Sequence, residues 1–570
     1  MNGELLQTIP LHSLYKLFPE TEPSDGFRNR FSALQNEPLS FQVAYRLRRD
    51  AAAMKLPVYV RVETDLPVEL YHVGFVPVAH TETEGLADRY RPGLFPDPLF
   101  PKAVNPPLRK LAPFPMLVED GERTTLHAAR DCYRAVWLTV GGKKTVMPAG
   151  DHTVTVVFFS AEDGSEVGRA SVTVRVVPAM LPKEKLIYTN WVHCDCIADM
   201  HGVPVFSDRF FEIFAHYIRL AAKNGMNTLL TPCFTPPLDT PIGEERMTVQ
   251  LVGVTVADGG YHFDFSLLDR FISVARRCGI RYFEHAHLFT QWGATCAPKI
   301  VARVRGREKT IFGWHTPVAE GKYEKFLRAY IPALLAHLRE QGLDRQFLFH
   351  ISDEPSSEHM EAYRRARAAL GDMLKGYTVM DAVFNYEPYA IGLVETPIAV
   401  TSGAAEYRGR CPRFFCYYTG GQCEKGMSNR FVVASAERNR MLGVQMYAMG
   451  ADGFLQWAYN YYYDFLSQGL FYPLTEPDGY LGRGPGTSYM VYPLPNGEVL
   501  ESIRQKVFCE GLNDHRALCR LAQLRGKRFV SALLREWYGE VDFYTPAGSA
   551  AKLLAFRDRV NDLIAESVTA

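Results

Sequence analysis

The sequence predicts an α/β protein built around a (β/α)8 barrel of the TIM type, preceded by an N-terminal β-sandwich and followed by C-terminal helices. Three observations predict this fold. Residues 1–180 have the pattern of short strands, residues 181–500 alternate strand and helix patterns, and residues 501–570 have a helical pattern. Because 570 residues exceed a single compact core, we expect a sandwich domain, a barrel domain and helices packed on the barrel, with these bounds.

The strands of the N-terminal region are indicated by Val, Thr and aromatic residues that alternate with polar residues at period two. Turns separate them, as at Gly141-Gly142 and Asp163-Gly164. A proline-rich stretch at 91–107 is expected to be an ordered irregular loop. Two packed sheets are the natural architecture for such strands. The clearest strands are PVYVRVET (57–64), YRAVWLTV (133–140), DHTVTVVFFS (151–160) and RASVTVRVVP (169–178).

After Met180 the pattern changes to alternating strands and helices. The first helix, 208–225, has apolar residues at helical spacing, with Ser207 before it as a cap and Gly225 as its stop. Eight strand–helix steps favour a closed barrel over the alternative of a doubly wound sheet. The expected strands are 185–196, 226–233, 280–289, 346–354, 376–384, 397–402, 413–419 and 453–460, and the expected helices are 208–225, 265–279, 323–342, 356–370 and 435–450.

The composition is that of a soluble globular protein and excludes several function classes. Lys plus Arg and Asp plus Glu both number 63, so no basic surface for nucleic acid is indicated. The first residues, MNGELLQTIP, lack a signal-peptide pattern and no apolar run reaches the roughly 18 residues of a membrane span, so we expect a cytoplasmic protein without a membrane partner. The 11 cysteines are then expected to be reduced thiols, and Cys194 and Cys196 have no second pair to complete a zinc site. The sequence leaves the oligomeric state open.

Polar residues that follow the barrel strands are the candidates for a functional site. In barrel enzymes the active site lies at the carboxyl ends of the strands, so we consider those ends alone. The candidates are His193, Asp195, His285, His287, Asp353, Glu354, Tyr417, Tyr418, Trp457, Tyr459 and Asn460.

Two adjacent carboxylates, Asp353 and Glu354, follow the apolar fourth strand in the segment HISDEP (350–355). Carboxylates beside a run of Phe, Leu and Ile are unfavourable unless they are hydrogen-bonded or functional. Pro355 then ends the strand and starts the next helix. The structural alternative is that the pair caps this helix and favours its positive end.

Alternation along the fourth strand predicts where its side chains point. If Glu354 faces the barrel interior, His350 and Ser352 face it too, while Phe349 and Ile351 meet the surrounding helices. Polar residues beneath a carboxylate fit the floor of an active site. Asp353 reaches the cavity as well, because the strand ends there.

His285 and His287 share one face of the third strand, and such a pair can bind a metal. A barrel metallohydrolase also needs histidines on the fifth and sixth strands, which have none, so we expect neither a metal nor metal dependence. The expected roles are a hydrogen-bonded core histidine and one substrate contact. Trp457 and Tyr459 on the eighth strand fit a sugar platform and ordinary barrel packing equally well.

The placement of the acids limits the mechanism. Glycosidases with two flanking carboxyl groups hold them ~5 Å apart when retaining and ~6.5–9.5 Å apart when inverting, often from two strands. Here the seventh strand ends in Tyr417 and Tyr418, and no acid follows before Glu424. Two neighbours on one strand can cooperate if the nucleophile is the carbonyl oxygen of a 2-acetamido group on the substrate. Glu354 is then the general acid and base, and Asp353 stabilises the cyclic intermediate.

Five segments of the barrel and C-terminal part resemble a known family. They are NWVHCDCIAD (190–199), EHAHLFTQWGA (284–294), ISDEP (351–355), FLQWAYNYY (454–462) and ESIRQKVFCEGLNDHRAL (501–518). They resemble glycoside hydrolase family 123, the exo-β-N-acetylgalactosaminidases, and the related domain of unknown function 4091. The resemblance implies a sandwich before the barrel and places the family's Asp-Glu pair on Asp353 and Glu354.

Together these inferences predict a retaining exo-β-N-acetylgalactosaminidase that uses substrate-assisted catalysis, without a cofactor, on small imported β-linked oligosaccharides or glycosides. One alternative is another sugar preference, such as β-N-acetylglucosaminides. A second is a non-catalytic carbohydrate-binding barrel, which the presence of both carboxylates argues against. The expected substrate contacts are His193, Asp195, His287, Trp292, Tyr386, Tyr418, Trp457 and Asn460.

Overall fold

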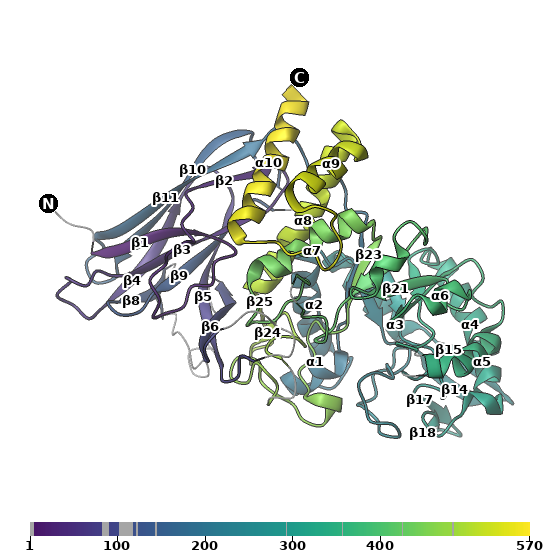
Figure 1. Cartoon of the computed structure of the whole chain (residues 1–570). Coiled ribbons are helices and arrows are strands. Elements are labelled where there is room, and N and C mark those ends of the chain that lie inside the picture. The colour runs from purple at the N-terminus through teal and green to yellow at the C-terminus, as the bar shows by residue number, and fades with distance from the viewer. Residues whose placement is uncertain are drawn as a thin grey trace. The chain divides into compact units, whose positions relative to one another are not determined.

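The computed structural model describes residues 5–82, 90–101, 118–120, 123–142, 145–291, 293–355, 357–424, 426–480 and 484–569. The chain divides into two compact units (Figure 1). The first comprises Met1–Glu184, Cys423–Met449 and Tyr472–Ala570, and the second comprises Lys185–Gln422 and Gly450–Phe471. Within the described part of the chain, no helix has both the length and the apolar character needed to cross a bilayer.

The first unit contains the predicted β-sandwich. One sheet has the order β1-β3-β9-β5-β6-β25-β24 and the other the order β2-β11-β10-β4-β8-β7. In β4, Leu56, Val58 and Val60 are buried at alternate positions, as the period-two pattern predicts. The strands are β1 (Leu6–His12), β2 (Arg30–Leu34), β3 (Leu39–Leu47), β4 (Lys55–Glu63), β5 (Val68–Val78), β6 (Gly93–Pro101), β7 (Val118–Asp120), β8 (Arg123–Ala129), β9 (Arg134–Val140), β10 (Gly150–Ser160), β11 (Glu166–Val177), β24 (Tyr492–Pro493) and β25 (Val499–Ser502).

The proline-rich stretch corrects one expectation. Its first part is not a loop but strand β6, which pairs with β5 along most of its length. Prolines lack the N–H that a central strand must donate. On its other side, however, β6 pairs with β25 only at Pro98 and Leu99, so it is nearly an edge strand that tolerates proline. The remainder of the stretch lies outside the described residues.

The second unit is the predicted barrel. Eight parallel strands close in the order β12-β13-β16-β19-β20-β21-β22-β23. The first and last strands pair from Ile187↔Gly453 onward, which excludes the doubly wound sheet. Gly453 permits this closure, because a Cβ atom there would lie 2.1 Å from the Phe415 ring. The strands are β12 (Ile187–Asn190), β13 (Thr228–Thr231), β16 (Tyr282–His285), β19 (Phe347–Phe349), β20 (Thr378–Val383), β21 (Thr396–Val400), β22 (Phe415–Tyr417) and β23 (Gly453–Gln456).

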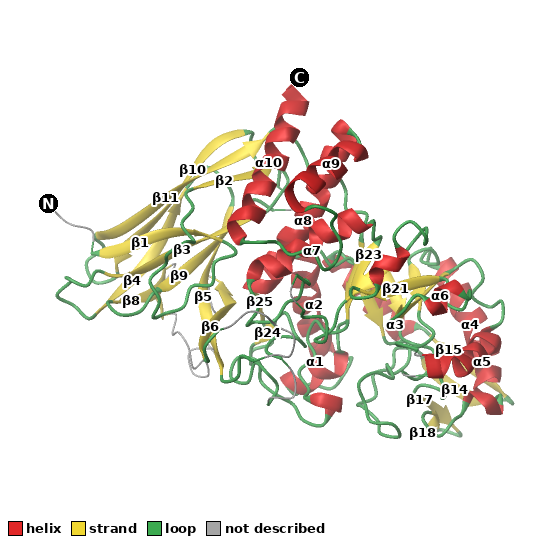
Figure 2. Cartoon of the chain, in the orientation of Figure 1, coloured by secondary structure: helices red, strands yellow, loops and turns green. Residues whose placement is uncertain are grey.

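The helices of this unit fall mostly where helical spacing predicts them, and Figure 2 shows them in red beside the yellow barrel strands. Ser207 caps α2, its hydroxyl accepting the N–H of Phe210. The helices are α1 (Cys194–His201), α2 (Asp208–Lys223), α3 (Ser266–Cys278), α4 (Lys322–Glu340), α5 (Met360–Leu370) and α6 (Glu387–Ala390).

Two features of the barrel unit escaped the sequence patterns. The first expected strand ends early, so His193 lies at the N-cap of α1 and Asp195 in its first turn. A small sheet of order β15-β14-β17-β18 also interrupts the barrel on either side of α3, where only loops were expected. Its strands are β14 (Gly253–Ala257), β15 (Gly260–Asp264), β17 (Ile300–Val304) and β18 (Arg307–Phe312).

The C-terminal helices belong to the first unit and not to the barrel unit. The helix expected after the seventh barrel strand, α7, also belongs there and crosses α8. The crossing is close, since a Cβ at Gly443 would lie 1.8 Å from the carbonyl oxygen of Gly511. Within this unit α10 contacts β2 and β11 of the sandwich, and the packing of these helices on the barrel stays a prediction. These helices are α7 (Ala436–Met449), α8 (Ile503–Arg525), α9 (Lys527–Tyr538) and α10 (Ala550–Thr569).

Candidate active site

The fourth barrel strand carries the carboxylate pair beyond its end. Leu348 lies in the core cluster of the barrel, and His350, two residues on, is fully buried between inward-facing groups. Phe349 instead packs against Tyr377, outside the barrel core cluster. The inward orientation expected of His350 is therefore confirmed. The helix that follows, α5, begins only at Met360 after a 3-10 turn, so the pair does not cap it.

Glu354 occupies an unusual backbone conformation. Its φ of 46° lies in the left-handed region, which a residue with a Cβ rarely adopts. Such a conformation costs about 1–3 kcal/mol and persists only where the surrounding structure imposes it, commonly at functional sites. The half-buried carboxylate accepts a hydrogen bond of 2.7 Å from the hydroxyl of Tyr417 at the end of β22.

Burial and mutual repulsion favour the protonated forms of both carboxyls. Burial, followed by the negative charge of Glu354, raises the pKa of Asp353 well above its ordinary value. Burial also raises the pKa of Glu354, and the Tyr417 hydrogen bond opposes this rise because it stabilises the ionised form. Within the described part of the chain, no donor reaches the Asp353 carboxylate. The pair therefore retains an affinity for a proton that exposed carboxylates lack.

A third carboxylate, Asp381 on β20, holds the backbone that leads to the pair. Its Oδ1 accepts the N–H groups of Ile351 at 2.8 Å and Ser352 at 3.3 Å. Its Oδ2 accepts a hydrogen bond from the hydroxyl of Tyr363 on α5. Burial raises the pKa of Asp381, and the nearby His350 opposes the rise.

His350 lies between two acids in the barrel interior. Its Nε2 is 3.7 Å from Oε2 of Glu284, and its Nδ1 is 3.7 Å from Oδ1 of Asp381. Burial alone would lower the pKa of His350, but the two carboxylates outweigh it and raise the pKa to about 9. The positive charge of His350 opposes the rise in the pKa of Asp353.

Three buried side chains, His287, His350 and Asp381, lie close enough to share a metal ion. The donor set fits a metal poorly, however. Both oxygens of Asp381 already accept hydrogen bonds, and a protonated His350 has no lone pair to offer. The arrangement is therefore an ion-pair cluster, and the expectation of no metal dependence stays a prediction.

The two histidines of the third strand face different surroundings, which corrects the expectation of a shared face. His285 bonds to the hydroxyl of Tyr330 on α4 at 2.8 Å. His287 packs against the rings of Trp191 and His350, at centroid distances of 5.2 and 4.7 Å. The strand ends at His285, so alternation no longer governs His287.

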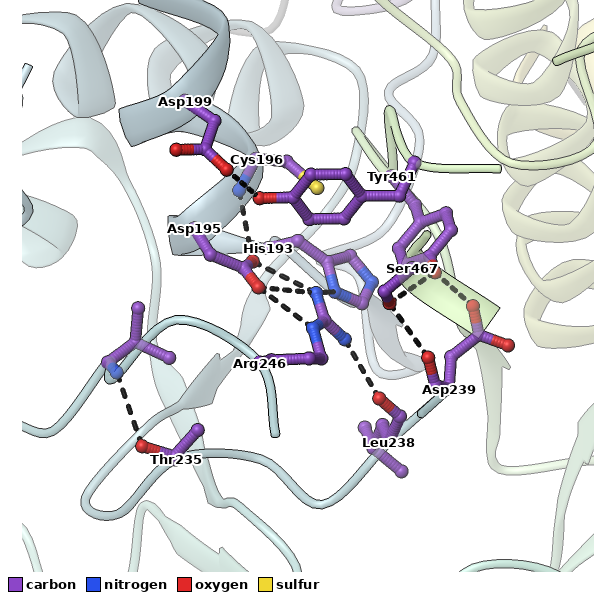
Figure 3. A network of polar contacts seen from close by, with 12 residues as sticks. His193, Asp195, Cys196, Asp199, Thr235, Leu238, Asp239, Arg246, Tyr461 and Ser467 are labelled. Carbon is purple, nitrogen blue, oxygen red and sulfur yellow. Dashed lines mark hydrogen bonds and ion pairs between the residues drawn. The ribbon is translucent and has the colours of Figure 1, made fainter. Parts of the chain in front are cut away.

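Several predicted substrate contacts lie in a buried network around Arg246 (Figure 3). Asp195 forms a two-oxygen ion pair with Arg246, with distances of 2.8 and 2.9 Å. A guanidinium nitrogen of Arg246 also lies 3.3 Å from Nδ1 of His193. Asn460 bonds to the backbone N–H and carbonyl of His193, at 2.9 and 3.1 Å. These contacts give His193, Asp195 and Asn460 structural partners, while their contact with substrate stays a prediction.

Asp239 is a site residue that the sequence patterns missed. It is half-buried on the loop after β13, with φ 51°, and its negative charge contributes to the raised pKa of Asp353. Tyr461 donates a hydrogen bond to the Asp239 carboxylate (Figure 3). The Gln291 side chain accepts the N–H of Asp239 at 2.7 Å. Because Asp239 lies eight residues beyond the strand end, only a pattern for the whole proline-rich loop could have found it.

The remaining candidates differ in exposure. Trp457 is half-buried and packs edge-on against Tyr461 at 5.2 Å, whereas Tyr459 is buried and bonds to the carbonyl of Tyr217. Tyr418 is fully buried against Phe454. Its neighbour Tyr417, at the same strand end, contacts Glu354 instead. Tyr386 is half-buried beside Tyr407, and Trp292 lies outside the described residues.

A closed parallel barrel that carries carboxyl groups beyond the end of one strand is an arrangement in which enzymes, glycoside hydrolases among them, place their active sites. Residues 191–521 match the family described as "Glycoside hydrolase 123, catalytic domain", which is more than half of the chain. The chain belongs to glycoside hydrolase family 123.

Comparison with solved structures agrees with this assignment at the level of the fold. A family 123 glycoside hydrolase from Clostridium perfringens, studied for glycolipid glycan hydrolysis, matches with a TM-score of 0.69 and 11% identity over 99% of this chain and 98% of its own. A family 39 glycoside hydrolase from Bacteroides cellulosilyticus reaches a TM-score of only 0.33, with 8% identity over 85% and 81% of the two chains. No curated protein matches the chain.

Proposed function

We propose that the protein is a retaining exo-β-N-acetylgalactosaminidase in which the substrate supplies the nucleophile. The observation that carries the proposal is the adjacency of Asp353 and Glu354 on one strand end, with Tyr417 where a second flanking acid would stand. Two neighbouring residues cannot readily flank one anomeric carbon on opposite faces. They can serve a 2-acetamido sugar whose own carbonyl oxygen attacks that carbon.

In the first step Glu354 donates its proton to the glycosidic oxygen as the bond from the anomeric carbon to that oxygen breaks. The acetamido oxygen forms a bond to the same carbon, which gives a cyclic oxazolinium ion. Asp353 accepts the amide N–H and stabilises the positive charge that develops on the nitrogen. In the second step Glu354 takes a proton from water, whose oxygen displaces the acetamido oxygen. Two displacements at one carbon retain the β configuration.

The pKa values support an exchange of the proton within the pair. Burial and the charge of Glu354 raise the pKa of Asp353 well above its ordinary value, whereas the Tyr417 hydroxyl opposes the rise at Glu354 because it favours the Glu354 carboxylate. An acetamido N–H that donates to Asp353 would stabilise its ionised form and leave the proton to Glu354. Binding of the correct substrate would thus set the protonation state that the reaction needs.

The substrate class is proposed from the mechanism and from the family. The similar Clostridium perfringens enzyme was studied for glycolipid glycan hydrolysis, which is compatible with a terminal β-linked amino sugar. We infer that the present enzyme removes single N-acetylgalactosamine residues from small β-linked oligosaccharides or glycosides.

The test is a panel of aryl β-glycosides that differ in sugar and at position 2. We expect turnover of the N-acetylgalactosaminide, slower turnover of the N-acetylglucosaminide and none of the plain galactoside. Glu354→Gln should lose most activity on aryl groups that leave poorly, because they need the proton most. Preference for the glucosaminide would correct the sugar, whereas comparable turnover of the plain galactoside would exclude the mechanism.

A further inference from the structure

The backbone between β19 and the carboxylate pair leaves the barrel ladder early. The pairing of β19 with β20 is limited to Leu348↔Thr378 and Phe349↔Val379. Beyond Phe349, the buried N–H groups of Ile351 and Ser352 need other acceptors, since a buried unpaired N–H is strongly unfavourable. A side chain on the neighbouring strand meets this need.

That side chain is Asp381, which is fully buried and bonds to both N–H groups through one oxygen. The other oxygen accepts the hydroxyl of Tyr363, whose side chain is also fully buried. Helix α5, strand β20 and the segment after β19 are thereby tied together through one carboxylate. Hydrogen bonds to a charged acceptor are stronger than neutral ones, so these bonds through Asp381, called the Asp381 tie below, restrict the movement of the segment.

The segment that Asp381 holds leads directly to the strained residue. Glu354, with φ 46°, follows Ser352 by two positions. A left-handed non-glycine residue relaxes unless its neighbours are fixed. The hydroxyl of Ser352 adds a second fixed point, because it donates to the carbonyl of Thr290 at 2.8 Å.

We propose that Asp381 and Tyr363 are positioning residues, which hold the turn at Asp353 and Glu354 in the geometry that catalysis requires. Neither residue is proposed to touch the substrate. The kinetic consequence rests on the proposed function, whereas the effect on the backbone does not.

The chain offers a matched control for Tyr363. Tyr330 on α4 is also a fully buried tyrosine whose hydroxyl bonds to a strand side chain, His285, at 2.8 Å. His285 is not the acceptor of the Ile351 and Ser352 N–H groups, which donate to Asp381. Tyr330→Phe and Tyr363→Phe remove the same hydroxyl from similar surroundings, but only the second disturbs the Asp381 tie.

The experiment compares wild type, Tyr363→Phe, Asp381→Asn and Tyr330→Phe by kinetics, thermal unfolding and amide hydrogen exchange. We expect both Tyr→Phe variants to lose similar stability. Tyr363→Phe and Asp381→Asn should lower kcat by about 10²-fold with KM changed less than about twofold, as loss of alignment does. Exchange of the amides at 351–354 should accelerate in these two variants and stay unchanged in Tyr330→Phe.

Equal kcat in the two Tyr→Phe variants, with unchanged exchange at 351–354, would overturn the proposal and leave Asp381 a purely structural residue. If wild type hydrolyses no acetamido glycoside, the proposed function fails but the exchange measurement still decides this proposal. If Asp381→Asn does not fold, Tyr363→Phe carries the test, since it leaves the carboxylate in place.

Discussion

The protein contains two clusters of buried charge, and they are built on opposite principles. In the first unit, a helix network of Glu37, Arg440, Glu510, Asp514 and Arg557 joins the sandwich to α7, α8 and α10. Each of its carboxylates faces a guanidinium, as Asp514 does at 2.7 Å from Arg440 and 2.9 Å from Arg557. Such a network offsets much of the desolvation of its charges, although burial still raises the pKa of Glu510.

At the barrel mouth the compensation is incomplete. His350 lies 3.7 Å from both Glu284 and Asp381, and its charge opposes the rise in the pKa of Asp353 without cancelling it. The result is a set of raised carboxyl pKa values at Asp353, Glu354 and Asp381, where the proposed mechanism needs a mobile proton. The comparison teaches that buried charges paired with guanidinium groups stabilise this fold, while the chemistry that we propose uses carboxyls whose charge is less well compensated.

The largest effect is expected in the helix network. Arg440→Met leaves Asp514 and Glu510 partly uncompensated, so the free energy of unfolding should fall by about 3–5 kcal/mol, with kcat of the folded enzyme unchanged. Chemical denaturation measures this loss. The control is Arg535→Met, which breaks an exposed pair with Glu540 and should cost less than about 1 kcal/mol. Equal losses in the two variants would remove the distinction between the networks.

The next effect lies at the barrel mouth and has the opposite character. Asp353→Asn relieves the repulsion within the pair, so stability should stay the same or rise. The rate should nevertheless fall by about 10²–10³-fold, because an amide cannot stabilise the positive charge on the substrate nitrogen. Steady-state kinetics and thermal unfolding of the same sample test both parts. A destabilised variant with unchanged kcat would place Asp353 among the structural charges.

The smallest effect concerns the proton affinity of Glu510 in the helix network. Burial, against the opposing charge of Arg440, raises the pKa of Glu510 from 4.5 to about 7. The folded protein then binds this proton more tightly than the unfolded chain. The stabilisation is complete below about pH 4.5 and is lost as the pH rises through 7. Glu510→Gln should therefore flatten the decline in unfolding free energy between these pH values, and parallel curves for the two proteins would contradict the shift.

The sequence predicted the barrel and the carboxylate pair because both leave local signals. The eight strand patterns and the adjacent acids of HISDEP are visible within a few residues. The supporting residues leave no such local signal, because their hydrogen bonds join distant parts of the sequence. Asp381 accepts from Ile351, 30 positions away, and Tyr461 donates to Asp239, 222 positions away. The placement of α7 and α8 was missed for the same reason, because the contact between Gly443 and Gly511 depends on three-dimensional packing.

The central claim is that the substrate's acetamido oxygen attacks the anomeric carbon with the help of Asp353 and Glu354. The most direct measurement is kcat/KM for aryl β-N-acylgalactosaminides whose acetyl group carries zero, one, two or three fluorine atoms. Fluorine withdraws electrons from the carbonyl oxygen and weakens it as a nucleophile. The account predicts a steep, monotonic fall in kcat/KM along the series. A flat series would contradict it and would require a nucleophile from the protein or from water.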